Sequence, residues 1–359
     1  MKILFVTNSC RGMYMFRREL VSEFLKTDTV VISAPRDDRF ADFEKMGCKM
    51  IDTDLSRHGK NVFREFFLLK KYNEILSAEK PDVVLTFTAK PNIYLPKICK
   101  RKNVKCIVNV AGLGGPFEKG KIVKNIFLKV YFSSLKRASF VFFQNEVIKK
   151  LFLDLGLEEE KCAILCGSGV NTDCFCAQDY PQESENITFL FAGRIVKDKG
   201  IDELLFCAKQ IKEKYPSTQF EIAGEFENGK YIEAFKKAQK DGTVDFLGFQ
   251  EDMRPLYKKA WAVIVPSYHE GLSNVCLEAA SSARPVIASD IPGCRETFED
   301  GKSGFVFEVK NQVALTEAVE KFIRLDYKEK VQMGLYGREK VQREFDRQSV
   351  VSAYKSEIL

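Results

Sequence analysis

The sequence predicts an α/β protein with two Rossmann-like, doubly wound domains that face a cleft. Short apolar runs alternate with helix-length amphipathic stretches along the chain, which is typical of parallel sheets covered by helices. The chain has 359 residues, enough for two such domains, and 45% of them are hydrophobic, as in a globular protein. A polar stretch at 177–186 separates the two halves and is interpreted as a linker.

The predicted strands form two sets, one in each half of the chain. In the first half they are 3–7, 29–33, 83–87, 105–110, 140–144 and 163–166. In the second half they are 188–192, 220–223, 244–247, 262–266 and 286–289. We therefore expect one domain at 1–175, a second at 187–340, and a C-terminal helix at 341–359 that returns to the first domain. The helical pattern of 331–359 gives these packing residues: Leu335, Val341, Phe345, Val350 and Tyr354.

Composition excludes several classes of protein. The net charge of +6 is too small for a dedicated nucleic-acid-binding protein, but it is compatible with an anionic membrane surface. No apolar run approaches the roughly 20 residues that span a bilayer, and residues 1–7 fit a first buried strand better than a signal peptide. The 11 scattered cysteines indicate thiols in a reducing cytoplasm. With two histidines and no paired CxxC spacing, no metal is expected.

The most informative motif lies at 267–278, directly after the strand predicted at 262–266. Glu270 and Glu278 flank a Gly-Leu-Ser-Asn turn that is expected to open a helix. Free backbone N–H groups and the positive end of a helix dipole favour an anion at such a turn. A carboxylate further along the helix can accept hydrogen bonds from the hydroxyls of a ribose. The motif therefore fits a phosphate-linked sugar.

A second motif lies at 193–200, after the first strand of the second half. Gly193 allows a sharp turn, and Arg194 and Lys199 are two cations at the mouth of a strand, where a diphosphate needs them. Taken alone, this segment fits a charged surface loop equally well. Together with Glu270 and Glu278, the phosphate interpretation becomes the stronger one.

These two motifs resemble the large family of retaining GT-B glycosyltransferases known as family four, whose hallmark is two glutamates separated by seven residues. The segments 284–296 and 301–304 also match. The resemblance implies that Arg194 and Lys199 hold the donor diphosphate, while Glu278 binds the ribose. It also implies that Glu270 contacts the transferred sugar and that amides in the turn bind the distal phosphate. The full set of expected donor-binding residues is Gly12, Gly193, Arg194, Lys199, Glu270, Gly271, Leu272, Ser273, Asn274 and Glu278, of which Glu270, Arg194 and Lys199 are the expected catalytic residues.

The first half resembles one branch of this family, through segments 14–20, 87–94 and 109–117. That branch assembles bacterial capsule, O-antigen and glycoprotein oligosaccharides and commonly extends a sugar on a polyprenyl diphosphate. Gly12 is expected to end the loop after the first strand, so that the backbone can approach the donor. Lys90, Arg17 and Arg57 are candidate acceptor-binding residues, although Lys90 would equally well cap a loop. No histidine stands at 109–111, so no catalytic histidine is assigned.

Two segments of the first half have competing interpretations. The stretch 119–137 is basic and apolar at helical spacing, which fits either a helix lying on an anionic membrane or an ordinary domain helix with a solvated lysine face. A lipid-linked acceptor favours the membrane. Asp52 and Asp54 have the Asp-x-Asp form that binds a divalent ion in another transferase fold, but they stand away from the diphosphate motifs and chance is favoured.

The sequence thus predicts a retaining, metal-independent glycosyltransferase that needs no cofactor. It moves a hexose or N-acetylhexosamine from a nucleoside diphosphate, expected to be UDP, to a sugar acceptor linked to polyprenyl diphosphate. Its expected location is cytoplasmic and peripheral, at the inner face of the cell membrane, with no nucleic-acid partner. Two alternatives stay open: a GT-B nucleotide-sugar epimerase, and a non-catalytic protein that binds sugar nucleotides.

Overall fold

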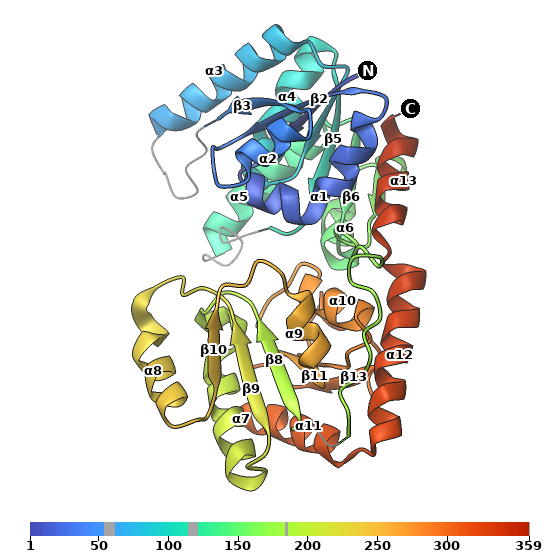
Figure 1. The fold of residues 1–359 in the computed structure, drawn as a ribbon. Helices are drawn as coiled ribbons and strands as arrows, with labels where there is room; N and C mark the ends of the chain where they lie inside the picture. Colours follow the sequence, from blue (N-terminus) through green and yellow to red (C-terminus); the bar gives the residue numbers. More distant parts are fainter. Residues whose placement is uncertain (54–61, 114–120, 184–185, 359) are drawn as a thin grey trace. The chain divides into compact units, whose positions relative to one another are not determined.

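The computed structural model describes residues 1–53, 62–113, 121–183 and 186–358, and they divide into two compact units (Figure 1). Unit 1 consists of Met1–Ser168 with Ser349–Leu359, and unit 2 consists of Gly169–Gln348. Residues 349–359 therefore group with the first unit, whereas 341–348, which were predicted to be part of the same returning helix, belong to unit 2. Within the described residues, no helix combines the length and the apolar character needed to cross a membrane.

Unit 1 is built around one parallel sheet with strand order β3-β2-β1-β4-β5-β6-β7. Its strands are β1 (Lys2–Val6), β2 (Thr29–Ala34), β3 (Lys49–Asp52), β4 (Val83–Thr86), β5 (Lys105–Val110), β6 (Phe140–Phe143) and β7 (Cys162–Ile164). Its helices are α1 (Cys10–Leu25), α2 (Phe40–Lys45), α3 (Val62–Glu79), α4 (Ala89–Lys102), α5 (Lys121–Leu135) and α6 (Glu146–Asp154). The chain continues from one strand to the next mostly through a helix, as parallel pairing requires.

Alternate residues of the central strand β1 pack in two separate hydrophobic cores, one on each face of the sheet. Leu4 and Val6 pack in a cluster with α3, α4 and α5, whereas Ile3 and Phe5 pack with α1 and α2. The second cluster also contains residues of α13 (Arg347–Ile358), among them Tyr354. Both faces of the sheet are therefore covered by helices, and burial explains why the strand reads as a continuous apolar run.

Unit 2 repeats this plan with the strand order β10-β9-β8-β11-β12-β13. Its strands are β8 (Thr188–Ala192), β9 (Gln219–Ala223), β10 (Asp245–Gly248), β11 (Ala262–Val265), β12 (Val286–Ser289) and β13 (Gly304–Phe307). Its helices are α7 (Ile201–Lys214), α8 (Ile232–Lys240), α9 (Arg254–Lys259), α10 (Asn274–Ser281), α11 (Gln312–Arg324) and α12 (Tyr327–Glu344). The predicted architecture of two parallel-sheet α/β domains is confirmed.

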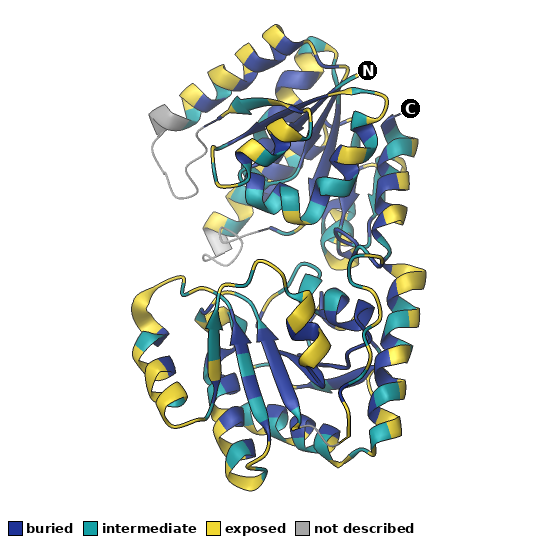
Figure 2. Cartoon of the chain, in the orientation of Figure 1, coloured by how far each residue is buried: buried dark blue, intermediate teal, exposed yellow. Residues whose placement is uncertain are grey.

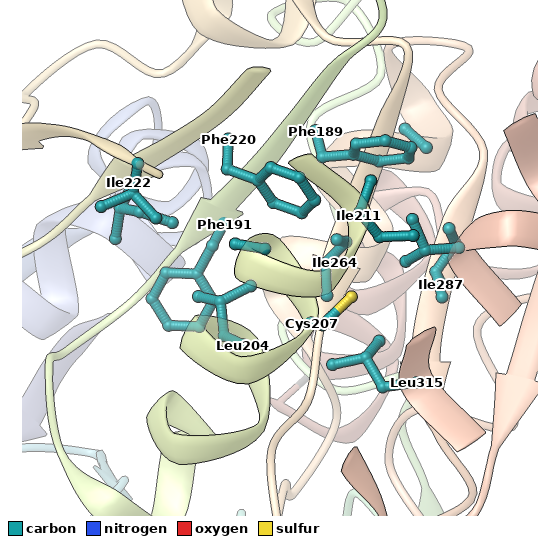
Figure 3. Packing of buried hydrophobic residues seen from close by; sticks show 14 of the residues in the cluster. Phe189, Phe191, Leu204, Cys207, Ile211, Phe220, Ile222, Ile264, Ile287 and Leu315 are labelled. Atoms are coloured by element: carbon teal, nitrogen blue, oxygen red, sulfur yellow. The ribbon is translucent and has the colours of Figure 1, made fainter. Parts of the chain in front are cut away.

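The larger core of unit 2 lies between the sheet and the helices α7 and α11. The rings of Phe189 and Phe220 pack in a tilted arrangement with centroids 5.2 Å apart, and Leu204 and Leu315 join the cluster from the two helices (Figure 3). In Figure 2, β8 is largely dark blue because most of its residues are buried, whereas the edge strand β10 is teal and yellow. This packing fixes the positions of the strand ends that carry the sequence motifs.

Two strands, β3 and β13, were not predicted from the sequence. Both are edge strands, paired on one side only. β3 has no buried residue and so lacks the apolar run that marks an interior strand, whereas β13 is largely buried and begins at Gly304. One packing prediction is wrong as well: Leu335 is 41% exposed on α12, whereas the other four predicted packing residues are buried.

Arg284 anchors the segment that the sequence presents as a free linker. It is fully buried, and its guanidinium donates to backbone oxygens of Gln178 and Asp179 in the linker and of Tyr257 and Lys258 in α9. Burial lowers the pKa of Arg284 to about 10, which leaves it charged at neutral pH. The beginning of the segment is therefore held against unit 2 by specific hydrogen bonds.

Candidate functional site

The structure brings Lys199 and Glu270 together at the carboxyl ends of two neighbouring strands. Lys199 follows β8, Glu270 follows β11, and these strands pair in parallel. Lys199 Nζ lies 2.5 Å from Glu270 Oε1, and the hydroxyl of Ser267 donates to the same oxygen at 2.7 Å. Both charged side chains are largely buried, with 21% and 16% exposure. A cation and a carboxylate thus lie where ligands of parallel α/β sheets bind.

Close backbone approach sets the position of the Lys199 loop. Gly200, directly after Lys199, has φ +70°, and a Cβ there would lie 2.0 Å from the carbonyl oxygen of Pro266. The N–H of Tyr268 donates to the carbonyl oxygen of Asp198 at 2.8 Å, which joins the two loops. Only glycine fits between them, so Gly200 is needed to bring Lys199 to Glu270.

Glu278 lies on α10 and has its own partner. Its Oε2 accepts a hydrogen bond of 2.9 Å from the hydroxyl of Tyr257 on α9. Burial raises the pKa of Glu278 to about 7, although the Tyr257 hydroxyl and the charge of Arg347 both favour the carboxylate. The side chain keeps some exposure to solvent. A carboxylate that titrates near neutral pH and accepts hydrogen bonds is chemically suited to a diol.

Arg194 extends from the turn at Gly193, whose φ is +154°. Its Nη1 lies 2.5 Å from Glu227 Oε2, and the two side chains are 64% and 46% exposed. Glu227 comes from the segment after β9, the strand next to β8. Exposed ion pairs contribute little to stability, about 0–1 kcal/mol. An incoming diphosphate can therefore replace Glu227 as the partner of Arg194.

The turn before α10 is only partly arranged as expected. Ser273 is the N-cap of the helix, and its hydroxyl accepts from the N–H of Cys276. The N–H of Ser273 itself donates to the carbonyl oxygen of Gly293 at 2.7 Å. That amide therefore already has a partner, and its predicted contact with phosphate requires this bond to break. Gly271, Leu272 and Asn274 are all partly exposed, and their contacts with the donor remain predictions.

The candidate residues of unit 1 are placed differently from one another. Gly12 does not end a loop, which corrects that prediction, because α1 begins at Cys10 and the Gly12 N–H donates to the N-cap hydroxyl of Ser9. Arg17 is 6% exposed, and its guanidinium lies 5.5 Å from the ring centre of Phe87. The structure thus gives Arg17 a packing role, and its contact with an acceptor remains a prediction.

Lys90 and Arg57 complete the acceptor candidates. Lys90 lies in the first turn of α4, where its Nζ donates to Glu65 Oε1 at 2.7 Å. Glu65 also accepts from the hydroxyl of Tyr94 at 2.6 Å, so α3 and α4 share a polar cluster. Arg57 lies outside the described residues. The roles of both in acceptor binding remain predictions.

The described residues contain no group of three or more His, Cys, Asp or Glu side chains that could hold a metal ion. Asp52 is at the end of β3, with its carboxylate 3.8 Å from Arg36 Nε. Asp54 lies outside the described residues. The 11 cysteines are free thiols, as the sequence indicates.

Sequence reasoning missed three residues that shape this site: Glu227, Ser267 and Tyr257. Ser267 stands three positions before Glu270, so its position in the motif was a usable signal. Glu227 and Tyr257 come from other segments, and only the fold brings them to Arg194 and Glu278.

Comparison with protein families identifies the chain. Residues 177–340 match the model described as "Glycosyl transferases group 1", and residues 2–145 match the model described as "Glycosyl transferase 4-like". The chain is a glycosyltransferase, whose second half is similar to the group 1 family and whose first half is similar to the glycosyl transferase 4-like family. The first model spans both the Lys199 loop and the Glu270–Glu278 motif.

Curated relatives of this glycosyltransferase act in bacterial surface glycan assembly. The chain is 25% identical to the N,N'-diacetylbacillosaminyl-diphospho-undecaprenol alpha-1,3-N-acetylgalactosaminyltransferase of Campylobacter jejuni, covering 89% of this chain and 88% of that protein. It is 29% identical to the capsular polysaccharide biosynthesis glycosyltransferase CapM of Staphylococcus aureus, over 46% of this chain and 44% of CapM.

Among solved structures, Anabaena HepE in complex with UDP superposes with a TM-score of 0.82 at 17% identity, covering 100% of this chain and 99% of HepE. At this identity the likeness shows the fold alone. It agrees with the two parallel-sheet domains described above.

Proposed function

We propose that this glycosyltransferase transfers a hexose or N-acetylhexosamine from UDP to a sugar acceptor linked to polyprenyl diphosphate, with retention of the anomeric configuration. The observation that carries the proposal is the Lys199–Glu270 pair at the ends of β8 and β11, with Ser267 fixing the carboxylate. In this proposal Lys199 would face the leaving diphosphate and Glu270 the transferred sugar.

In this proposal the charges of the site stabilise the departing diphosphate. As the bond to the anomeric carbon breaks, negative charge grows on the diphosphate, and Lys199, Arg194 and the N-terminus of α10 are positioned to balance it. Glu270 would orient the sugar and favour the positive charge at its anomeric carbon. The departing phosphate oxygen would take the proton of the acceptor hydroxyl. With these groups, the reaction needs no metal ion.

Two relatives support the choice of donor and acceptor. The Campylobacter jejuni relative carries a diphospho-undecaprenol acceptor in its name and aligns with most of this chain. HepE, which shares the fold, was crystallised with UDP. We propose by this analogy that the chain uses a UDP-sugar and a lipid-linked acceptor at the cytoplasmic face of the membrane, where it makes peripheral contact through the basic stretch 119–137.

The proposal is tested with a panel of nucleotide sugars and acceptors. UDP release should require both a UDP-sugar and a sugar on a polyprenyl diphosphate, and the product linkage, read by NMR, should keep the configuration of the donor. An inverted product, or release that depends on no acceptor, would contradict it. An epimerase would instead interconvert the sugar nucleotides of the panel without any acceptor.

A further inference from the structure

A groove of about 710 Å³ lies in unit 1 between the helices α3, α4 and α5, and we name it the α3–α5 groove. Each helix contributes residues at helical spacing: Phe66 and Lys70 from α3, Tyr94 and Lys97 from α4, and Val130 from α5. The groove therefore runs along one surface of the three helices, whose other sides pack on the sheet.

The charge of the α3–α5 groove is of one sign. Five exposed cations line it, and its lining contains no carboxylate; these are Lys70, Lys97, Arg101, Lys129 and Arg137. The described helices α4 and α5 carry no Asp or Glu at all. Two acids of α3 lie close to the lining: Glu74 is 3.8 Å from Lys70, and Glu65 accepts a hydrogen bond from Tyr94. A surface of this kind attracts an anionic partner.

Large apolar side chains stand exposed beside these cations. Phe66 and Phe67 are 66% and 64% exposed on α3, with ring centres 6.4 Å apart, and exposed residues run along this helix in Figure 2. On α5, Ile126 and Val130 are 60% and 48% exposed, whereas Tyr131 of the same helix is fully buried in the core. The apolar residues of α5 thus divide between the core and the surface.

We infer that the α3–α5 groove docks on an anionic lipid bilayer, with Phe66 and Phe67 inserted among the lipids and the cations against the headgroups. Exposed apolar side chains beside lysine and arginine are the combination that binds at a membrane interface. The inference rests on the proposed lipid-linked acceptor and extends it, because it adds α3 and α4 to the basic stretch of α5 and identifies the side chains that enter the bilayer.

A second groove in the molecule provides the matched control. It has a volume of about 540 Å³ and lies in unit 2 beside α7 and α8. Its lining includes Lys209 and Lys237 but also Glu213 and Asp241, so its charges are mixed. Lys209 and Lys237 are exposed, as Lys97 and Arg101 are. Reversing either pair of cations changes the net charge of the protein equally.

The test is sedimentation of the full chain with vesicles of phosphatidylglycerol and phosphatidylcholine, against vesicles of phosphatidylcholine alone. Wild type should bind the anionic vesicles and be released by salt. The double variant K97E/R101E should bind at least about tenfold more weakly, and F66S/F67S should also bind more weakly, while K209E/K237E should bind as wild type does. All four positions in unit 1 are exposed, so circular dichroism should show folded proteins.

Three outcomes would overturn the inference. The first is that K97E/R101E and F66S/F67S bind the anionic vesicles as tightly as wild type does. The second is that K209E/K237E loses as much binding as K97E/R101E, which would mean that binding depends on net charge alone. The third is a wild type that ignores vesicles but self-associates through Phe66 and Phe67. UDP release from a UDP-sugar, with a sugar on polyprenyl diphosphate presented in detergent as the acceptor, is measured in parallel. If no UDP is released while the groove variants lose vesicle binding as expected, the proposed function is wrong but the docking surface is supported.

Discussion

Arg194 Nη1 lies 2.5 Å from Glu227 Oε2, so the cation expected to hold the donor diphosphate already has a carboxylate partner in the structure without ligand. The pair joins the loop after β8 to the segment after β9. Because the pair is exposed, breaking it should cost the fold little stability. We therefore expect Glu227 to compete with the diphosphate for Arg194.

Glu227→Gln should therefore tighten the binding of UDP. The expected gain is about two- to fivefold in Kd, since an exposed ion pair is worth up to about 1 kcal/mol. Arg194→Ala should weaken binding and lower turnover at least about tenfold, because charge-assisted hydrogen bonds contribute about 1.5–3 kcal/mol. Calorimetric titration with UDP measures both. Arg324→Ala, which removes an equally exposed and Glu-paired arginine on α11, is the control and should change neither quantity.

Lys199 should be required for turnover, and the effect of replacing it on stability should depend on the replacement. Lys199→Ala removes the cation beside the largely buried Glu270 and leaves it the hydrogen bond from Ser267, so it should cost both activity and stability. Lys199→Gln keeps a hydrogen-bond donor for Glu270 and should fold normally, yet lose at least about tenfold in turnover. Steady-state rates and thermal unfolding separate the two effects. Near-normal turnover in the Gln variant would remove Lys199 from the catalytic set.

Glu278 should make stability depend on pH. Its pKa is about 7 in the folded protein, against an ordinary value of 4.5. The folded form then binds more protons than the unfolded form between these values, so this group's contribution to stability falls as pH rises through that window. The difference in the free energy of unfolding between Glu278→Gln and wild type should shift in favour of the variant between about pH 5 and about pH 8. The expected shift is at most about 3 kcal/mol.

Urea unfolding at the two pH values measures this difference between Glu278→Gln and wild type. Solvent access to Glu278 will reduce the effect below its upper bound. If the difference in stability is the same at both pH values, Glu278 is ionised throughout the range and its burial does not raise its pKa.

Chelation should leave turnover intact. If Arg194, Lys199 and the N-terminus of α10 stabilise the leaving diphosphate, the reaction needs no divalent ion. Activity after dialysis against EDTA should stay close to that of the untreated enzyme. Loss of activity that manganese restores would instead direct attention to Asp52 and Asp54, and Asp52→Asn would then be the next variant.

Arg284 should be needed for stability. Its buried guanidinium donates to six backbone oxygens. Arg284→Ala should lower the free energy of unfolding by about 3 kcal/mol or more, since it leaves buried acceptors without donors. Arg284→Lys keeps the charge but not the planar fork, and should recover only part of the loss. Denaturant unfolding of both variants tests this, and equal stability of Lys and Arg would show that charge alone matters.

The strands inside the two sheets could be predicted because burial on both faces imposes a continuous apolar run. β5, β8 and β12 have the bounds that the sequence predicts. The edge strand β3 could not be predicted in this way, since it pairs on one side and has no buried residue. The missed strand β13 is largely buried, so edge exposure does not explain why it was missed. Gly12 was placed in a loop because the apolar pattern does not show that α1 already begins at Cys10. There the Ser9 hydroxyl caps the helix by accepting a hydrogen bond from the Gly12 N–H.

The sequence by itself determined the alternation of strands and helices, and the motifs that place Arg194, Lys199, Glu270 and Glu278 after strands or on a helix. These features are local, since each depends on residues a few positions apart. Only the tertiary structure decided the partners. Lys199 meets Glu270 because β8 and β11 are neighbours in the sheet although 71 positions separate the two residues. The charges and pKa values of the site follow from such contacts, which depend on packing between distant segments rather than on spacing along the chain.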